Sequence, residues 1–100
     1  MSVQIIENWT NIVGVLKDSQ RNETLNGFLT LEIEVTQAHP IEGFANLLAD
    51  AAGQTIHVNA RVELAENFQL TPGAIVNCRV RRGGANSLFM HPEHFSVNAK

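Results

Sequence analysis

Hydrophobic and polar residues alternate most regularly in the segment from Phe28 to Thr36. If this chain is extended, one face carries the aliphatic residues Leu29, Leu31, Ile33 and Val35. The opposite face then carries the polar residues Thr30, Glu32, Glu34 and Thr36. A period of two residues is typical of a half-buried strand, whereas a helix would scatter these aliphatic residues around its circumference. The segment is therefore predicted to be a strand with its carboxylates in water.

Two further strands are predicted near the ends of the chain. Residues 9–17 are rich in β-branched and apolar side chains, and Gly14 in their middle indicates a bulge or the close approach of another backbone. Residues 88–97 form the last predicted strand, which is interrupted by Pro92. Because proline has no N–H to donate, this strand must bulge at Pro92 or lie on a sheet edge.

The stretch from Gly53 to Arg82 limits the architecture most. It contains a predicted strand over 54–60, a short amphipathic helix over 62–68, a Leu-Thr-Pro-Gly turn over 70–73 and a strand over 74–82. The residues expected to face inward are Ile56, Val58 and Ala60 in the first strand and Val76, Cys78 and Val80 in the second. A strand, a short helix that plugs one end and a returning strand indicate a small closed β-barrel.

The remaining connections are less regular. Residues 19–27 are polar and end in Asn-Gly, which predicts a loop. Residues 40–53 allow two interpretations. Their apolar residues fit a helical stripe, but residues 43–50 also fit a strand that enters a hairpin turn ending at Gly53. We favour the hairpin, because Gly53 would then join two adjacent strands.

Over roughly residues 28–97, the chain resembles the oligonucleotide/oligosaccharide-binding (OB) fold. The resemblance rests on the order of the predicted strands, with a short helix between the third and fourth barrel strands, and on the phrase LTPGAIVNCRVRR at the entry to the fourth. It implies an all-β barrel of five or six strands that binds single-stranded nucleic acid, sugars or proteins on one face. The fold alone does not decide among these ligands.

Length and composition indicate a single domain. The chain has 100 residues, of which 44% are hydrophobic, so it can form a core without disulfides. We expect an N-terminal arm over residues 1–8 and one barrel domain over residues 9–98. The N-terminus does not resemble a secretory signal, no apolar run is long enough to span a membrane, and there is one cysteine. These features predict a cytoplasmic protein.

Charge is distributed unevenly along the chain. Residues 1–50 contain two basic and seven acidic residues, a net charge of −5, whereas residues 51–100 contain five basic and three acidic residues, a net charge of +2. This asymmetry predicts a polarised surface if the fold keeps the halves apart, and mixed charges if the strands interleave.

The basic residues of the second half are the candidates for binding. Single-strand nucleic-acid binding would use a positive groove of Arg61, Arg79, Arg81 and Arg82, with His57 nearby, together with exposed aromatic side chains. We expect instead that the six aromatic residues help to fill the core. Phe28 is the exception, because it falls on the acidic face of its strand. A negatively charged chain with four clustered arginines also has a weak electrostatic drive toward phosphates.

No feature of the sequence predicts catalysis, a cofactor or a metal. Cys78 lies on the inward face of its strand, where a thiol is a core residue and not a nucleophile. His91, Glu93 and His94 are zinc-ligand types, but a strand turns the two histidines to opposite faces unless a bulge rotates one of them. Glu32 and Glu34 share a face that is open to solvent, where nothing would shift their pKa values for catalysis.

We therefore predict a non-enzymatic binding or assembly module that acts through protein–protein contacts, most simply between copies of itself. The basic face of Arg79, Arg81 and Arg82 and the acidic face of Glu32 and Glu34 would meet between subunits, if they are not neighbours within one subunit. The alternative is a single-strand nucleic-acid-binding domain that uses Arg61, His57 and the same three arginines.

Overall fold

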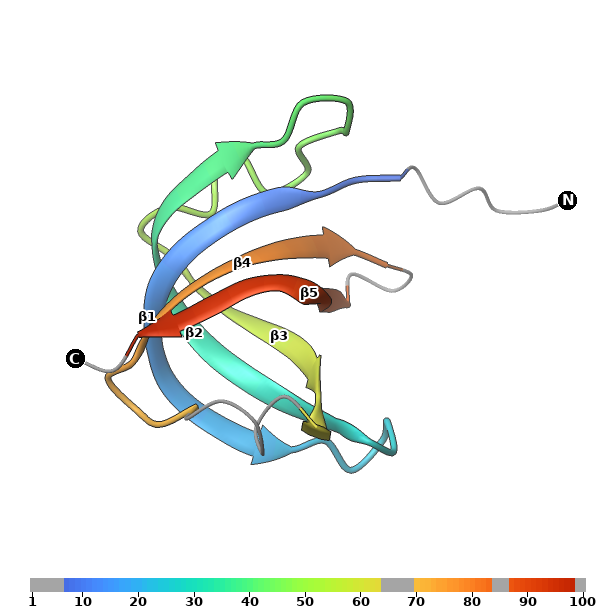
Figure 1. Ribbon diagram of the computed structural model, residues 1–100, viewed down its shortest axis with the longest axis vertical. Helices are drawn as coiled ribbons and strands as arrows, with labels where there is room; N and C mark the ends of the chain where they lie inside the picture. The colour runs from blue at the N-terminus through green and yellow to red at the C-terminus, as the bar shows by residue number, and fades with distance from the viewer. Residues whose placement is uncertain (1–6, 64–69, 84–86, 99–100) are drawn as a thin grey trace, which may run out of the picture.

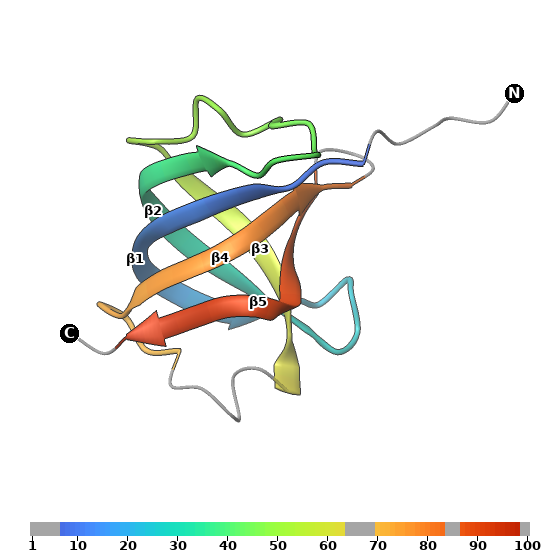
Figure 2. The ribbon, with the colours of Figure 1, turned by 45° about the horizontal axis from the view of Figure 1, so that its top comes forward.

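The computed structural model describes residues 7–63, 70–83 and 87–98. Among these residues it contains five strands: β1 (Thr10–Arg21), β2 (Phe28–Pro40), β3 (Thr55–Arg61), β4 (Ile75–Arg82) and β5 (Leu88–Asn98). The strands form a closed barrel in the order β1-β2-β3-β5-β4 (Figures 1 and 2). The last strand in this order, β4, pairs with β1 and so closes the ring. The predicted all-β barrel is thus confirmed.

The strongly bent β1 makes closure possible (Figure 1). It pairs along its whole length with β2, and its first half, from Thr10 to Val15, also pairs with β4. The register with β2 shifts between Val13 and Gly14 and again between Leu16 and Asp18. Bulges of this kind bend a strand and increase its twist. The bulge predicted at Gly14 is therefore present, and it lies next to Val15, where the pairing of β1 with β4 ends.

The other pairs complete the ring. All are antiparallel except β3 with β5, which are parallel and meet at Asn59 and Phe89. In β5 the chain bulges between Met90, which pairs with Val80, and Phe95, which pairs with Cys78. Pro92 lies inside this bulge, as predicted from its missing N–H group.

The aliphatic residues predicted to face inward form one core. Leu31, Ile33, Val35, Val58, Ala60, Val76, Cys78 and Val80 are all buried in a single cluster, and Leu29 and Ile56 pack against it. Residues Ile12, Leu16, Leu88 and Met90 of β1 and β5 complete the barrel interior. The two-residue periodicity therefore identifies the core-facing side of each strand correctly.

Two connections differ from prediction. The loop expected over 19–27 is shorter, because Ser19, Gln20 and Arg21 continue β1 and pair with β2. The incoming strand expected over 43–50 is wrong: residues 41–54 form a series of turns. The alternation needed for a strand is missing there, and contacts with a distant segment hold the chain instead. The Thr10 hydroxyl donates to Asn46 Oδ1 at 2.6 Å, and the Trp9 N–H donates to the carbonyl of Ala45 at 3.2 Å.

The remaining predicted elements are local. The turn at 70–73 is present: the N–H of Ala74 bonds to the carbonyl of Thr71, and Gly73 has a φ of 94°, which favours glycine. Of the helix predicted over 62–68, Val62 and Glu63 are helical, and residues 64–68 lie outside the described residues. Most of the N-terminal arm, residues 1–6, also lies outside them.

Candidate functional site

The described aromatic residues lie outside the barrel core. The buried core consists of aliphatic residues with one cysteine and one methionine. Trp9, Phe28, Phe89 and Phe95 are half-buried, and Phe44 is 37% exposed. The expectation that aromatic residues fill the core is therefore wrong for Trp9, Phe44 and Phe89, whereas Phe95 packs against the core cluster. Phe28 is the predicted exception, and Phe68 lies outside the described residues. Inward-facing aliphatic side chains from five strands already fill the narrow interior. The aromatic rings therefore lie at the surface or pack against the edge of the core.

Two phenylalanines and two arginines form a continuous cluster on the outer surface, which we call the Arg–Phe face. Arg61 Cζ lies 5.7 Å from the centre of the Phe28 ring, and Arg81 Cζ lies 5.4 Å from the centre of the Phe89 ring. The two rings meet edge to face, with their centres 6.1 Å apart and an interplanar angle of 79°. Both contacts are within the range of cation–π attraction, and the ring pair has a preferred aromatic geometry. Each side chain comes from a different strand.

Barrel closure brings these four residues together. Phe28 pairs with Arg61 across β2 and β3, and Phe89 pairs with Arg81 across β5 and β4. The parallel contact of β3 with β5 then places one pair beside the other. Both arginines are among the residues predicted for binding, whereas Phe89 is among the aromatic residues predicted to help fill the core. The signal for Phe89 was its outward phase, since its neighbours Leu88 and Met90 are the buried ones.

A cluster of polar side chains borders the Arg–Phe face on β2 and β3. The Asn22 amide donates to Thr30 Oγ1 at 3.1 Å and to Asn59 Oδ1 at 2.9 Å. Asn22 Oδ1 accepts the backbone N–H groups of Thr24 and Leu25, both at 2.8 Å, so the loop between β1 and β2 is held by its own side chain. A hollow of about 130 Å³ lies beside this loop, lined by Arg21, Asn22, Asn26, Gly27, Phe28 and Val62.

The bulge of β5 forms a second aromatic group. The His91 ring lies 4.9 Å from the Trp9 ring and 4.5 Å from the His94 ring, centre to centre. His91 Nδ1 accepts the backbone N–H groups of Glu93 and His94, at 3.0 and 3.2 Å. Partial burial lowers the pKa of His91, and the positive charges of His94 and Arg79 lower it further, against the opposing effect of Glu93. Of the predicted arginines, Arg79 is thus placed beside the histidines.

The predicted acidic residues lie farther along β2. His57 Nε2 is 3.3 Å from Glu32 Oε1, and Lys17 Nζ is 3.8 Å from Glu34 Oε2. Both contacts are solvent-exposed, and the first is an ion pair only when the imidazole is protonated, so each adds at most about 1 kcal/mol to stability. Because β1 separates β2 from β4, the acidic face and the face of Arg79 and Arg81 are not cross-strand neighbours.

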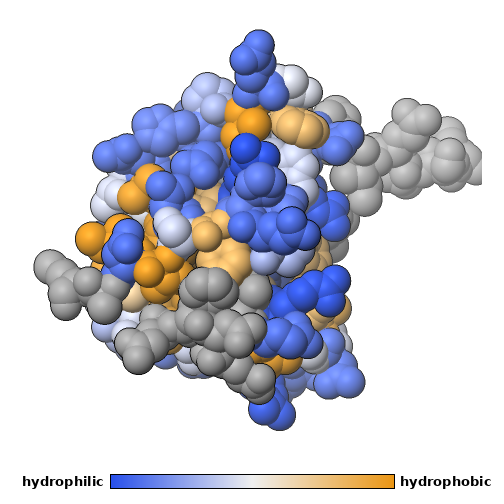
Figure 3. Space-filling model, in the orientation of Figure 1, coloured by the Kyte–Doolittle hydropathy of each residue, from blue (hydrophilic) through white to orange (hydrophobic). Residues whose placement is uncertain are grey.

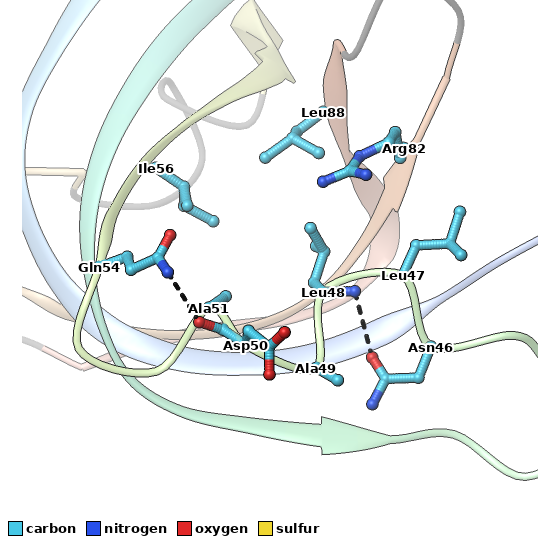
Figure 4. Close-up of a pocket in the computed structure, with 10 residues that line it drawn as sticks. All are labelled: Asn46, Leu47, Leu48, Ala49, Asp50, Ala51, Gln54, Ile56, Arg82 and Leu88. Carbon is cyan, nitrogen blue, oxygen red and sulfur yellow. Dashed lines mark hydrogen bonds between the residues drawn. The ribbon is translucent and has the colours of Figure 1, made fainter.

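Arg82 lies on the opposite face of β4 from Arg79 and Arg81, because side chains alternate along a strand. It continues the inward series of Val76, Cys78 and Val80, and it lines a pocket of about 500 Å³ under the segment 41–54 (Figure 4). The prediction from the sequence groups Arg82 with Arg79 and Arg81 because the three are close together in the chain. The alternation of β4 already places it on the other face.

Other chemistry is limited in the part of the chain that the structure describes. Burial raises the pKa of the Cys78 thiol to about 12, so it is not a nucleophile near neutral pH. Within residues 7–63, 70–83 and 87–98, no group of three or more His, Cys, Asp or Glu side chains could hold a metal ion. Among the same residues, no helix has the length and apolar character to cross a membrane.

The chain was also compared with known proteins. It matches no protein-family model, and a search of curated proteins finds no match.

Proposed function

We propose that this protein is a barrel of the OB type that binds single-stranded nucleic acid on the Arg–Phe face. The strand order β1-β2-β3-β5-β4 supports the first part of this proposal. OB barrels bind oligonucleotides and oligosaccharides on the face of their second and third strands, between the loops that join strands 1 to 2 and 4 to 5. Here that face carries Phe28, Thr30, Asn59 and Arg61, and Phe89 follows the second of these loops.

The arrangement of the Arg–Phe face is the observation that carries the proposal. Proteins bind single strands by stacking bases on aromatic rings and by placing cations along the sugar–phosphate backbone. Arginine serves both purposes, because its planar guanidinium stacks on bases and also pairs with phosphate. Four contiguous side chains supply both functions here. Beside them, the Asn22 amide holds the Oδ1 atom of Asn59, so the Asn59 Nδ2 group can donate to base edges.

The charge of the protein indicates which contribution dominates. The net charge is −3, so the long-range attraction to phosphate is weak. Two arginine–phosphate contacts would make the logarithm of the affinity fall with the logarithm of the salt concentration with a slope of about −1.4. Base stacking contributes roughly 1–3 kcal/mol per base, so we expect most of the affinity to come from Phe28 and Phe89.

The test is fluorescence anisotropy with labelled single-stranded DNA and RNA oligonucleotides at low salt. Phe28→Ala and Phe89→Ala should each weaken binding by roughly 5- to 150-fold, the loss of one stacked base. Phe44→Ala is the matched control, because Phe44 is exposed on the segment 41–54 and lies outside the Arg–Phe face. Changing Arg61 and Arg81 together to glutamine should flatten the salt dependence. Thermal melting verifies that each variant is folded. Absence of binding by the native protein, or equal binding by the phenylalanine variants, refutes the proposal.

A second candidate is the self-association predicted from the sequence, which a different surface favours. On the outside of β1, Val15 lies between Ile75 of β4 and Glu34 of β2, and Ile75 is 39% exposed. Figure 3 shows hydrophobic side chains gathered on one side of a mostly hydrophilic face. The acidic strand β2 flanks Val15 on one side, and Arg79 lies farther along β4, opposite Asn11 of β1. A two-fold axis through this apolar surface would place acid against base. Sedimentation should then show a dimer that Ile75→Asp dissociates, whereas a monomeric native protein excludes it.

A further inference from the structure

The pocket under the segment 41–54 lies at one end of the barrel. About half of its lining is apolar, contributed by Leu47, Leu48 and Ala51 from this segment, Ile56 from β3 and Leu88 from β5. The other half is polar and includes Asn46, Asp50, Gln54 and Arg82. Its volume of about 500 Å³ is within the range of small-molecule sites. Leu47 is 40% exposed although it borders a buried leucine, so part of this apolar surface is open to solvent. Figure 4 shows the Arg82 guanidinium extending from β4 toward this apolar lining.

Arg82 is an unusual residue for this position. The three preceding inward residues of β4 are aliphatic or cysteine and almost fully buried, so packing alone would favour another apolar side chain. Arg82 Nε is buried, and it has no hydrogen-bond partner among the described residues. Among the residues that the structure describes, no carboxylate forms an ion pair with the Arg82 guanidinium. Burying the Arg82 Nε–H group without an acceptor is costly.

The backbone at Arg82 is held in place. Asn8 Oδ1 accepts the Arg82 N–H at 2.8 Å, and Asn8 Nδ2 donates to the Arg82 carbonyl at 3.0 Å. Asn8 itself is buried, so this double contact secures the end of β4. The guanidinium therefore projects from a fixed point, which lowers the entropic cost of binding an anion.

We propose that this pocket binds a monocarboxylate with an aliphatic body, either a free acid or the C-terminal residue of a peptide. The carboxylate would pair with the Arg82 guanidinium, whose planar donors match two carboxylate oxygens. The carbon chain would lie against Leu48, Ile56 and Leu88. Asp50 also lines the pocket, and Figure 4 shows it across from Arg82, where its charge would repel a second anionic group. This site is separate from the Arg–Phe face, and it does not depend on nucleic-acid binding.

The first test compares two ligands on the native, full-length protein. N-acetyl-leucine and N-acetyl-leucinamide differ in the carboxylate alone, and both can be titrated against the ¹⁵N-labelled chain by NMR. We expect the acid to shift the backbone amides of residues 46–51, Ile56 and Leu88. The amide should bind about ten- to 150-fold more weakly, the loss of a charged hydrogen-bond partner. Equal binding of the two, or shifts confined to other residues, overturns the proposal.

Variants and further ligands sharpen the test. Arg82→Gln should weaken binding of the acid as much as removing the ligand's charge does. Arg79→Gln, the matched control on the outer face of the same strand, should change it by less than two-fold. Octanoate and a peptide ending in leucine separate the two sources of the carboxylate: binding of either supports the site, and binding of neither overturns it. Tighter binding of inorganic phosphate than of both octanoate and the peptide also overturns it.

Discussion

Gly14 is the position where a single methyl group should disturb the barrel most. A Cβ at this residue would lie 2.5 Å from the carbonyl oxygen of Glu34 and 2.6 Å from Cγ2 of Ile33. Neither neighbour can yield easily. The Glu34 oxygen belongs to the backbone of β2, and Ile33 is 1% exposed and packed in the core. Gly14→Ala must therefore push β1 away from β2 at the bend on which closure depends.

The expected cost follows from these contacts. Inserting a methyl group into a well-packed interior costs roughly 1–3 kcal/mol when neighbours must shift. Replacing glycine with alanine also restricts the unfolded chain, which returns about 0.4–1 kcal/mol. Because backbone atoms must move here, we expect a net loss of about 1–3 kcal/mol in the free energy of unfolding. For a domain of this size, that loss lowers Tm by roughly 4–8 °C per kcal/mol.

Urea unfolding followed by circular dichroism measures this loss directly. Ser19→Ala is the control, because Ser19 lies in the part of β1 that pairs with β2 and not with β4. It should change the free energy of unfolding by less than about 0.5 kcal/mol. An unchanged m-value would show that the variant unfolds to the same extent. If Gly14→Ala is as stable as the native protein, β1 and β2 do not approach as described, and the steric argument fails.

Three further predictions concern buried or partly buried groups. Because burial raises the Cys78 pKa to about 12, thiol reagents at pH 8 should modify the native protein only as fast as the barrel opens; rapid modification without denaturant contradicts this. The His91 imidazole should titrate below its ordinary pKa of 6.5 in an NMR titration. The folded protein then binds the His91 proton less readily than the unfolded chain does. The stability that neutral His91 contributes is therefore present above pH 6.5 and is lost as the pH falls through the lowered pKa. His91→Gln should reduce this loss of stability at low pH. Thr10→Val should cost about 1–3 kcal/mol in urea unfolding, because it removes the buried hydroxyl that donates to Asn46.

The sequence by itself determined the positions and buried faces of the five strands, although it also favoured a strand over 43–50 that the structure does not have. Alternation is a local property of an extended chain, so the spacing of Leu31, Ile33 and Val35 assigns their side of β2 without knowledge of any partner. The same holds for Val76, Cys78 and Val80 on β4. The bulges at Gly14 and Pro92 could also be predicted from the sequence. Each has a local cause, since Gly14 lacks a side chain and Pro92 lacks an N–H group. The inward phase of Arg82 could have been inferred in the same way.

Only the tertiary structure decided which outward side chains meet. Phe28 and Phe89 are far apart in the sequence, and their contact depends on the strand order and on the parallel pairing of β3 with β5. The segment 41–54 depends equally on distant partners, since Asn8, Trp9 and Thr10 hold it against the barrel. Pairing register and barrel closure are properties of several strands together, so no single stretch of sequence contains them.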